Sequence, residues 1–83
     1  MIQLDLFPMD LTMRCIDPAQ NKRRFYALSV QPTLFGDWVL VREWGRIGLG
    51  GQVRQDFFPS AGKALDALRE IAQSKRRRGY QPL

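Results

Sequence analysis

The hydrophobic period of this chain changes once, at Pro59, and this change limits the fold more than any other feature. Before Pro59, short segments of alternating apolar and polar residues are separated by Pro, Gly, Asn and Asp, which is typical of β-strands joined by turns. After it, apolar residues recur at every third or fourth position, as on one face of an amphipathic helix. We therefore predict an α+β fold in which one C-terminal helix packs on one face of a small antiparallel β-sheet.

Four segments before Pro59 have strand character. They are residues 9–16, 24–30, 38–44 and 52–58. Because the connections between them are short, we expect consecutive strands to pair antiparallel in a sheet of about four strands. The segments 17–22 and 31–37 carry turn residues, and the glycines of 45–51 end the third strand, since glycine tolerates the positive φ of tight turns.

A single helix follows, with recognisable signals at both ends. Ser60 is a suitable N-cap, the basic residues at 75–78 complement the negative end of the helix dipole, and Gly79 can end the helix. The apolar stripe that should pack on the sheet consists of Ala61, Ala64, Leu65, Leu68, Ile71 and Ala72. We expect the last residues, 80–83, to form a short extended piece beside the sheet.

Length and composition describe one small domain with a modest core, because the chain has 83 residues. We expect an N-terminal extension over 1–10, the folded domain over 11–80 and a tail over 81–83. The N-terminus has neither the positive region nor the apolar run of a secretory signal, and no apolar run reaches the ~20 residues that span a bilayer. We therefore expect a cytoplasmic location and no membrane partner.

The chain offers no set of residues for catalysis. It has no histidine and a single cysteine, Cys15, which excludes Ser–His and Cys–His pairs, an intrachain disulfide and a zinc site. The glycine run 48–51 lacks the lysine and the following helix of phosphate-cradling loops. Asp37 and Glu43 have no second acidic residue nearby. We therefore expect a non-catalytic protein without metal or cofactor, in which Cys15 packs in the core.

Positive charge gathers in three segments of a chain whose formal net charge is +5. These are "NKRR" at 21–24, "REWGR" at 42–46 and "KRRR" at 75–78. A basic excess of this size attracts anionic partners over long range. If "NKRR" forms a loop beside the glycine loop, the three segments would make one basic patch.

The third predicted strand places an aromatic ring between two cations. Alternation puts Arg42, Trp44 and Arg46 on the same face as Trp38 and Leu40. Trp38 and Leu40 are expected in the core, but arginine is seldom buried without a partner, so the stripe should leave the core near Trp44. Trp44 would then point outward and stack on a base or ribose while the arginines bind phosphates. A Trp packed in the core beside surface arginines, and a protein-docking surface, are the alternatives.

The segment "WGRIGLGGQ" at 44–52 resembles the signature of the WGR domain, which is named for its Trp-Gly-Arg sequence. Further likenesses are "NKRRFYALSV" at 21–30, the Phe pair at 57–58, Ala64 and "KRRRGY" at 75–80, so that the resemblance covers about residues 11–80. WGR domains occur in eukaryotic poly(ADP-ribose) polymerases and, alone or fused to other domains, in bacterial proteins. This chain resembles the stand-alone bacterial kind.

The resemblance implies a small antiparallel sheet with one helix, and binding to DNA at breaks. By analogy with the polymerases, Trp44 would pack on a terminal sugar, and Arg46 would contact DNA and neighbouring domains. Asn21 would help to hold a 5′-terminal phosphate, and Gln52 would close the glycine loop. We expect this chain to lack the catalytic and regulatory domains that the WGR domain serves in those enzymes.

The sequence thus predicts a non-catalytic module that binds nucleic acid, DNA rather than RNA, at ends or nicks. Base-specific reading is not expected, because no helix presents a row of groove-reading residues. Protein binding through the same Trp and Arg surface is the alternative function. Tyr80 is expected to pack in the core. The candidate nucleic-acid-binding residues are Asn21, Lys22, Arg23, Arg24, Arg42, Trp44, Gly45, Arg46 and Gln52.

Overall fold

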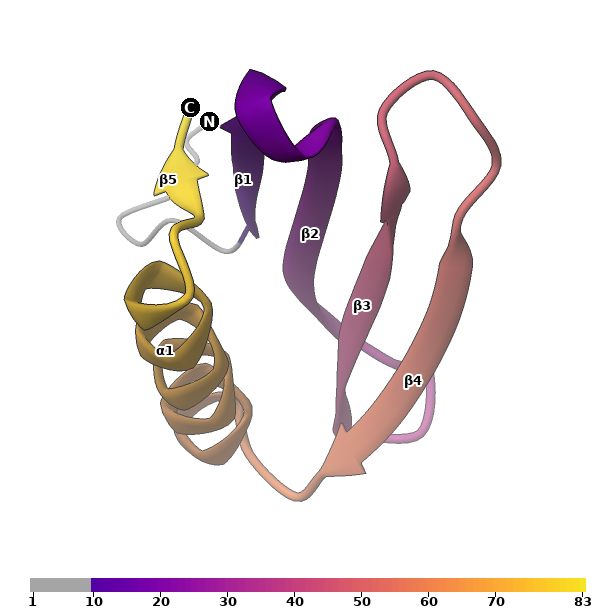
Figure 1. Cartoon of the computed structure of the whole chain (residues 1–83). Helices are drawn as coiled ribbons and strands as arrows, with labels where there is room; N and C mark the ends of the chain where they lie inside the picture. The colour runs from indigo at the N-terminus through magenta and orange to yellow at the C-terminus, as the bar shows by residue number, and fades with distance from the viewer. Residues whose placement is uncertain (1–9) are drawn as a thin grey trace, which may run out of the picture.

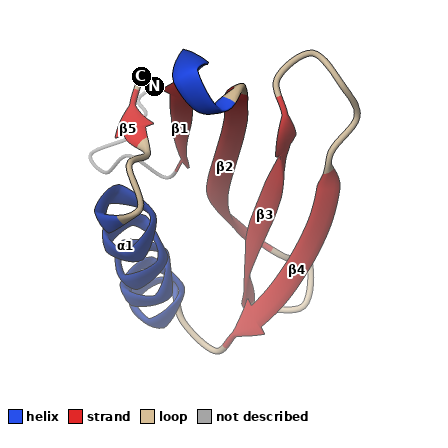
Figure 2. Ribbon diagram, viewed as in Figure 1, coloured by secondary structure: helices blue, strands red, loops and turns tan. Residues whose placement is uncertain are grey.

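The computed structural model describes residues 10–83, so the expected N-terminal extension lies almost entirely outside the described residues. Its elements are β1 (Asp10–Asp17), the short 3₁₀ helix η1 (Pro18–Gln20), β2 (Lys22–Pro32), β3 (Trp38–Arg46), β4 (Gln52–Phe58), α1 (Ala61–Arg77) and β5 (Gln81–Pro82). Figure 1 shows a curved sheet with α1 lying on its inner face, and Figure 2 shows the single long helix against the strands. This is the predicted α+β architecture.

The sheet contains five antiparallel strands in the order β4-β3-β2-β1-β5. The sequence predicts about four strands. The fifth, β5, is the short extended piece expected near the C-terminus, and it pairs with β1 at Met13 with Pro82 and at Arg14 with Gln81. Residues 81 and 82 are therefore part of the sheet, beyond the boundary expected at residue 80.

The predicted strands are present, and two of them are longer than expected. β2 begins at Lys22, so "NKRR" is not a loop: only Asn21 precedes the strand, with a left-handed φ of 54°. β3 continues through Gly45 to Arg46, two residues past the predicted end. The start of β2 pairs with β1, where Lys22 lies opposite Asp17, and the end of β3 pairs with β2, where Arg46 lies opposite Arg24. Pairing with a neighbouring strand outweighs the turn-like composition of these residues.

Helix α1 begins and ends where the sequence predicts. The Ser60 hydroxyl accepts a hydrogen bond from the Lys63 backbone N–H at 3.2 Å, which confirms the N-cap. Gly79 has a φ of 99°, and the N–H of Tyr80 donates to the Lys75 carbonyl at 3.1 Å, the pattern of a Schellman motif. This turn directs the chain back toward the sheet. No helix within residues 10–83 is long and apolar enough to cross a membrane.

The core lies between α1 and the inner face of the sheet. Its buried side chains are Met13, Cys15, Tyr26, Leu28, Val30, Leu40, Ala64, Leu68, Ala72 and Tyr80. Leu65, Ile71 and Trp38 pack against it while partly buried. The helical stripe therefore faces the sheet, and the core positions expected for Cys15 and Tyr80 are confirmed. Each large apolar side chain buried here contributes ~1.5–3 kcal/mol before entropy is counted.

Candidate nucleic-acid interface

Trp44 lies at the end of β3, beside Tyr26 of the neighbouring strand. The two residues are direct cross-strand partners, and their rings stack with centroids 5.7 Å apart and planes 13° from parallel. Tyr26 is buried, whereas Trp44 is half-buried and packs against the edge of the core. The sequence predicts an indole that points outward; in the structure Tyr26 occupies one of its two faces.

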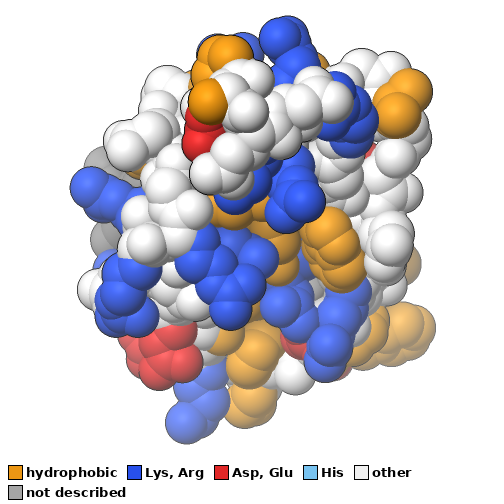
Figure 3. All heavy atoms as spheres, in the orientation of Figure 1, with side chains coloured by type: hydrophobic (Ala, Val, Ile, Leu, Met, Phe, Trp, Pro, Cys, Tyr) orange, Lys and Arg blue, Asp and Glu red, His pale blue; other side chains and the backbone are white. Residues whose placement is uncertain are grey.

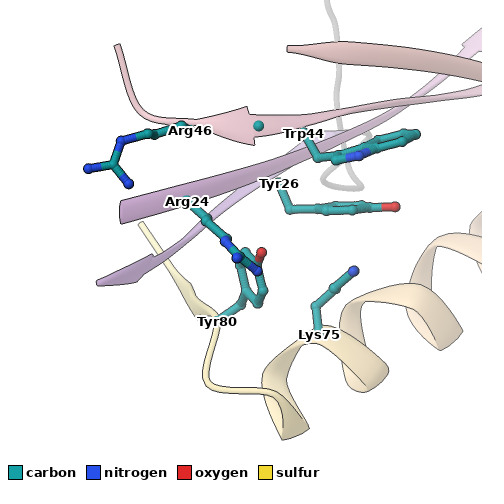
Figure 4. Close-up of a pocket in the computed structure, with 7 residues that line it drawn as sticks. Arg24, Tyr26, Trp44, Arg46, Lys75 and Tyr80 are labelled. Carbon is teal, nitrogen blue, oxygen red and sulfur yellow. The ribbon is translucent and has the colours of Figure 1, made fainter. Parts of the chain in front are cut away.

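Lys75 extends from the last turns of α1 to the opposite side of Tyr26. Its Nζ lies 4.5 Å from the Tyr26 ring centroid and 5.6 Å from that of Tyr80, which meets Tyr26 edge-on. Burial lowers the pKa of the Lys75 ammonium, and the positive charges of Arg78, Arg42 and Arg24 lower it further. Figure 4 shows the resulting layers: Trp44, Tyr26 and then the Lys75 side chain. A cation is thus held on aromatic faces in a region of positive potential.

These residues line a pocket of about 420 Å³ on the inner face of the sheet, between the ends of β2 and β3 and the C-terminal end of α1. We call it the aromatic pocket. Its lining residues are Arg24, Tyr26, Trp44, Gly45, Arg46, Lys75 and Tyr80. No carboxylate of the described residues is among them. Figure 3 shows blue Lys and Arg side chains gathered on this face of the molecule, with orange hydrophobic side chains between them. One basic residue from each of the three basic segments, Arg24, Arg46 and Lys75, therefore lines the same pocket.

Arg46 is held at the rim of the aromatic pocket by Asn21. Its two terminal nitrogens donate to the Asn21 backbone carbonyl at 3.1 Å and to the Asn21 side-chain oxygen at 3.3 Å. Arg24 lies directly opposite Arg46 across β2 and β3. Two like charges in directly opposed positions destabilise a sheet.

Arg42 takes a different place from the one expected. Its Nη2 forms an ion pair with Asp56 at 3.1 Å, and its Nη1 donates to the Tyr26 hydroxyl at 3.5 Å. Arg54 binds the other oxygen of the same carboxylate at 3.2 Å. The Arg42 side chain is only 19% exposed. Arg42 therefore positions β4 and the Tyr26 ring. Its positive charge also helps to lower the pKa of Lys75, which lines the aromatic pocket.

The remaining predicted residues flank the aromatic pocket without lining it. Lys22 is half-buried at the start of β2, and Arg23 is exposed on the face opposite to Arg24, because side chains alternate along a strand. Gln52 is exposed at the start of β4, directly opposite Trp44. The structure thus brings Asn21, Arg24, Trp44, Gly45 and Arg46 together.

Comparison with known proteins identifies the family of this chain. The model of the family described as "WGR domain" matches residues 9–83, which include every described strand and helix. The chain belongs to the WGR domain family. The protein of Sinorhizobium fredii (strain NBRC 101917 / NGR234) named "Uncharacterized protein y4dW" is 41% identical to it over 75 residues, which cover 90% of this chain and 37% of that protein. The chain thus spans well under half the length of that relative. WGR domains are non-catalytic modules associated with nucleic-acid binding or protein interaction.

Two glycines of this WGR domain are required by packing within the protein. A Cβ at Gly51 would lie 2.6 Å from the Trp44 carbonyl oxygen and 3.0 Å from the Phe25 ring. A Cβ at Gly45 would lie 3.0 Å from the Gly51 Cα. Gly48, by contrast, has a φ of 88° and open space around it, as a turn requires. The glycine loop therefore lets the ends of β3 and β4 approach closely.

The candidate binding residues predicted from sequence did not include three residues of the WGR domain's pocket, Tyr26, Lys75 and Tyr80, although Lys75 belongs to the basic segment 75–78. Lys75 lies seven residues after Leu68, so it continues the buried helical stripe, and a lysine at such a position signals a charge directed at the sheet. No comparable signal exists for Tyr26, whose place beside Trp44 depends on the register of β2 with β3.

Proposed function

We propose that this WGR domain binds DNA at ends or nicks, with the aromatic pocket receiving the terminal nucleotide. The observation that supports this most is the meeting of three aromatic rings with Arg24, Arg46 and Lys75 around one hollow without a carboxylate in its lining. Aromatic faces with cations at their rim suit a ligand that combines a planar or sugar surface with phosphate.

Trp44 supplies the stacking surface. Tyr26 covers one face of the indole and fixes its orientation, and the half-buried Trp44 lines the pocket that would receive the ligand. Stacking of a base on an aromatic side chain contributes ~1–3 kcal/mol and does not depend on sequence. A stack held in place before binding loses little side-chain entropy when the ligand arrives.

The cations supply the phosphate contacts. Asn21 occupies donors of two Arg46 nitrogens, but a guanidinium has five N–H groups, so Arg46 keeps donors for a phosphate. Arg24 faces the same hollow from β2, and Lys75 faces it from α1. Arginine binds phosphate oxygens in a two-pronged fashion, whereas lysine acts as a point charge.

The size of the aromatic pocket favours a strand terminus over continuous duplex. At about 420 Å³ it matches sites for one small ligand. A terminal nucleotide exposes a sugar and a base face that an internal nucleotide keeps within the stack. A nick or an end therefore offers what the pocket can enclose.

A binding screen tests this proposal. Fluorescence anisotropy would compare nicked, blunt-ended, single-stranded and closed circular DNA at about 50 and about 200 mM salt. We expect tighter binding to nicked and blunt-ended DNA than to closed circles. Trp44→Ala should lose ~1–3 kcal/mol of affinity for ends, with partial recovery in Trp44→Phe. Phe35→Ala is the matched control, because Phe35 is 92% exposed and does not line the pocket.

Equal affinity for ends and closed circles, or for Trp44→Ala and wild type, would contradict the proposal. Circular dichroism should show that Trp44→Ala folds, with a lowered melting temperature, because the stack with Tyr26 is lost as well. Protein binding through the same surface is the alternative, since Trp, Tyr and Arg are also typical of interface hot spots. Capture of a protein with little dependence on salt, together with weak DNA binding, would favour that alternative.

A further inference from the structure

Strand β4 forms one edge of the sheet, and its outer side has no strand partner among residues 10–83. It is seven residues long, and its apolar side chains Val53 and Phe57 are each 59% exposed. Natural proteins usually shorten, bulge or cover such an edge, because an exposed one can pair with another strand. The opposite edge, β5, has only two residues. An uncovered edge of seven residues with two exposed apolar side chains therefore suggests a partner strand.

The order of side chains along β4 limits which partner fits. Val53, Gln55 and Phe57 lie on the outer face of the sheet, and Arg54 and Asp56 lie on the inner face, because side chains alternate. A second copy that extends the sheet about a two-fold axis pairs antiparallel and keeps inner face with inner face. Opposed residues then share a face, so one residue of β4 must lie opposite the same residue of the second copy. We name the position of the axis by that residue.

There are three central registers, with the axis at Arg54, Gln55 or Asp56. Only the register at Gln55 places opposite charges in opposed positions. An axis at Gln55 places Arg54 opposite Asp56 of the second copy, and Val53 opposite Phe57 of the second copy. It also aligns the two strands over their full length, from Gln52 to Phe58. An axis at Arg54 or at Asp56 would instead place that residue opposite itself, and like charges in opposed positions are destabilising.

We propose that β4 is a self-pairing edge, through which two copies of this domain join their sheets about an axis at Gln55. Asp56 can accept the additional arginine, because a carboxylate has about four acceptor sites and Arg42 and Arg54 of its own chain each use one oxygen. The two-fold axis leaves both α1 helices, and hence both aromatic pockets, on the same face of the joined sheet. This interface does not depend on the proposed DNA binding.

Sedimentation equilibrium of the 83-residue chain over a wide concentration range tests this interface. We expect a reversible dimer. Arg54→Glu should weaken it about tenfold or more, because the axis places two repulsive Glu–Asp pairs in each interface. Mixing Arg54→Glu with Asp56→Lys should restore association, since each Glu then faces a Lys and each Asp faces an Arg. Arg14→Glu makes the same change of charge on an exposed residue of β1 and should leave the dimer unchanged.

A second pair of variants tests the outer face and avoids the ion pairs of Asp56. Val53→Glu alone should dissociate the dimer, and mixing it with Phe57→Lys should restore it. Circular dichroism would verify folding, and if an inner-face variant fails to fold, the outer-face pair decides. A wild-type chain that remains monomeric at millimolar concentration would overturn the proposal. So would a dimer that tolerates both Arg54→Glu and Val53→Glu, because its interface would lie elsewhere.

Discussion

At the scale of single residues, Lys75 carries a positive charge where positive charge is disfavoured. Burial against Tyr26 and the nearby arginines lowers the pKa of its ammonium. A bound phosphate would stabilise the charged form and raise that pKa again. Binding should therefore take up protons between the pKa of the free protein and that of the complex.

The affinity for DNA should consequently fall as pH rises through the lowered pKa of Lys75. Below that pKa, Lys75 is charged in both states and affinity should be constant. Lys75→Arg keeps its charge throughout, so its affinity should fall less between about pH 7 and about pH 10. Anisotropy titrations of both proteins over this range would measure the difference. Parallel pH profiles would show that Lys75 does not contact the ligand.

Gly51 offers a second prediction at this scale, about stability. A methyl group there would meet the Trp44 carbonyl, so Gly51→Ala should lower the free energy of unfolding by ~1–3 kcal/mol. Gly50 has nothing within 4 Å of its would-be Cβ, so Gly50→Ala should have almost no effect. Denaturant unfolding of both variants makes the comparison. Equal losses would mean that flexibility, not close packing, explains the glycines.

The candidate site could be predicted from sequence only in part. Alternation along the third strand correctly placed Arg42, Trp44 and Arg46 on one face with Leu40. It could not show that Asp56 neutralises Arg42, because that contact depends on the pairing of β3 with β4. Contacts across strands are fixed by register, which local patterns do not specify.

At the scale of elements, α1 depends on its caps. Ser60 provides the only side-chain hydrogen bond to the helix N-terminus seen within residues 10–83. Ser60→Ala should therefore reduce the free energy of unfolding by ~0.5–2 kcal/mol. Ser74→Ala, inside the same helix, removes a hydroxyl that caps nothing and should be neutral or slightly stabilising. Chemical denaturation monitored at the helical circular dichroism band would compare them, and a similar loss in both would contradict the capping role.

The elements themselves were largely predictable from sequence, because each carries its own local signal. The helix was set by its stripe, by Ser60 and by Gly79, and β4 matches its predicted bounds. The exceptions are residues whose conformation is decided by a distant partner. Lys22 joins a strand because it pairs with Asp17 of β1, Gly45 because it pairs with Phe25 of β2, and Gln81 because β1 is beside it.

At the scale of the whole molecule, the basic segments should act together on phosphate. If Arg24, Arg46 and Lys75 each neutralise one phosphate, log K should fall with log salt with a slope of about −3. Arg24→Ala should reduce the slope by about 1, whereas Arg14→Ala, on the outer face of β1, should leave it unchanged. Anisotropy titrations at several salt concentrations would give these slopes. Equal slopes for the two variants would indicate diffuse attraction instead of a defined site.

The pairing of β5 with β1 also determines how this domain could be carried within a longer protein. The backbone N–H of Leu83 donates to the Thr12 carbonyl at 3.1 Å, so the described chain enters and leaves at neighbouring points. Segments attached before and after would emerge from a single corner of the sheet. A domain tethered in this way can rotate as a unit relative to its neighbours, and it can be inserted into a surface loop of a host protein without separating the two stems of that loop.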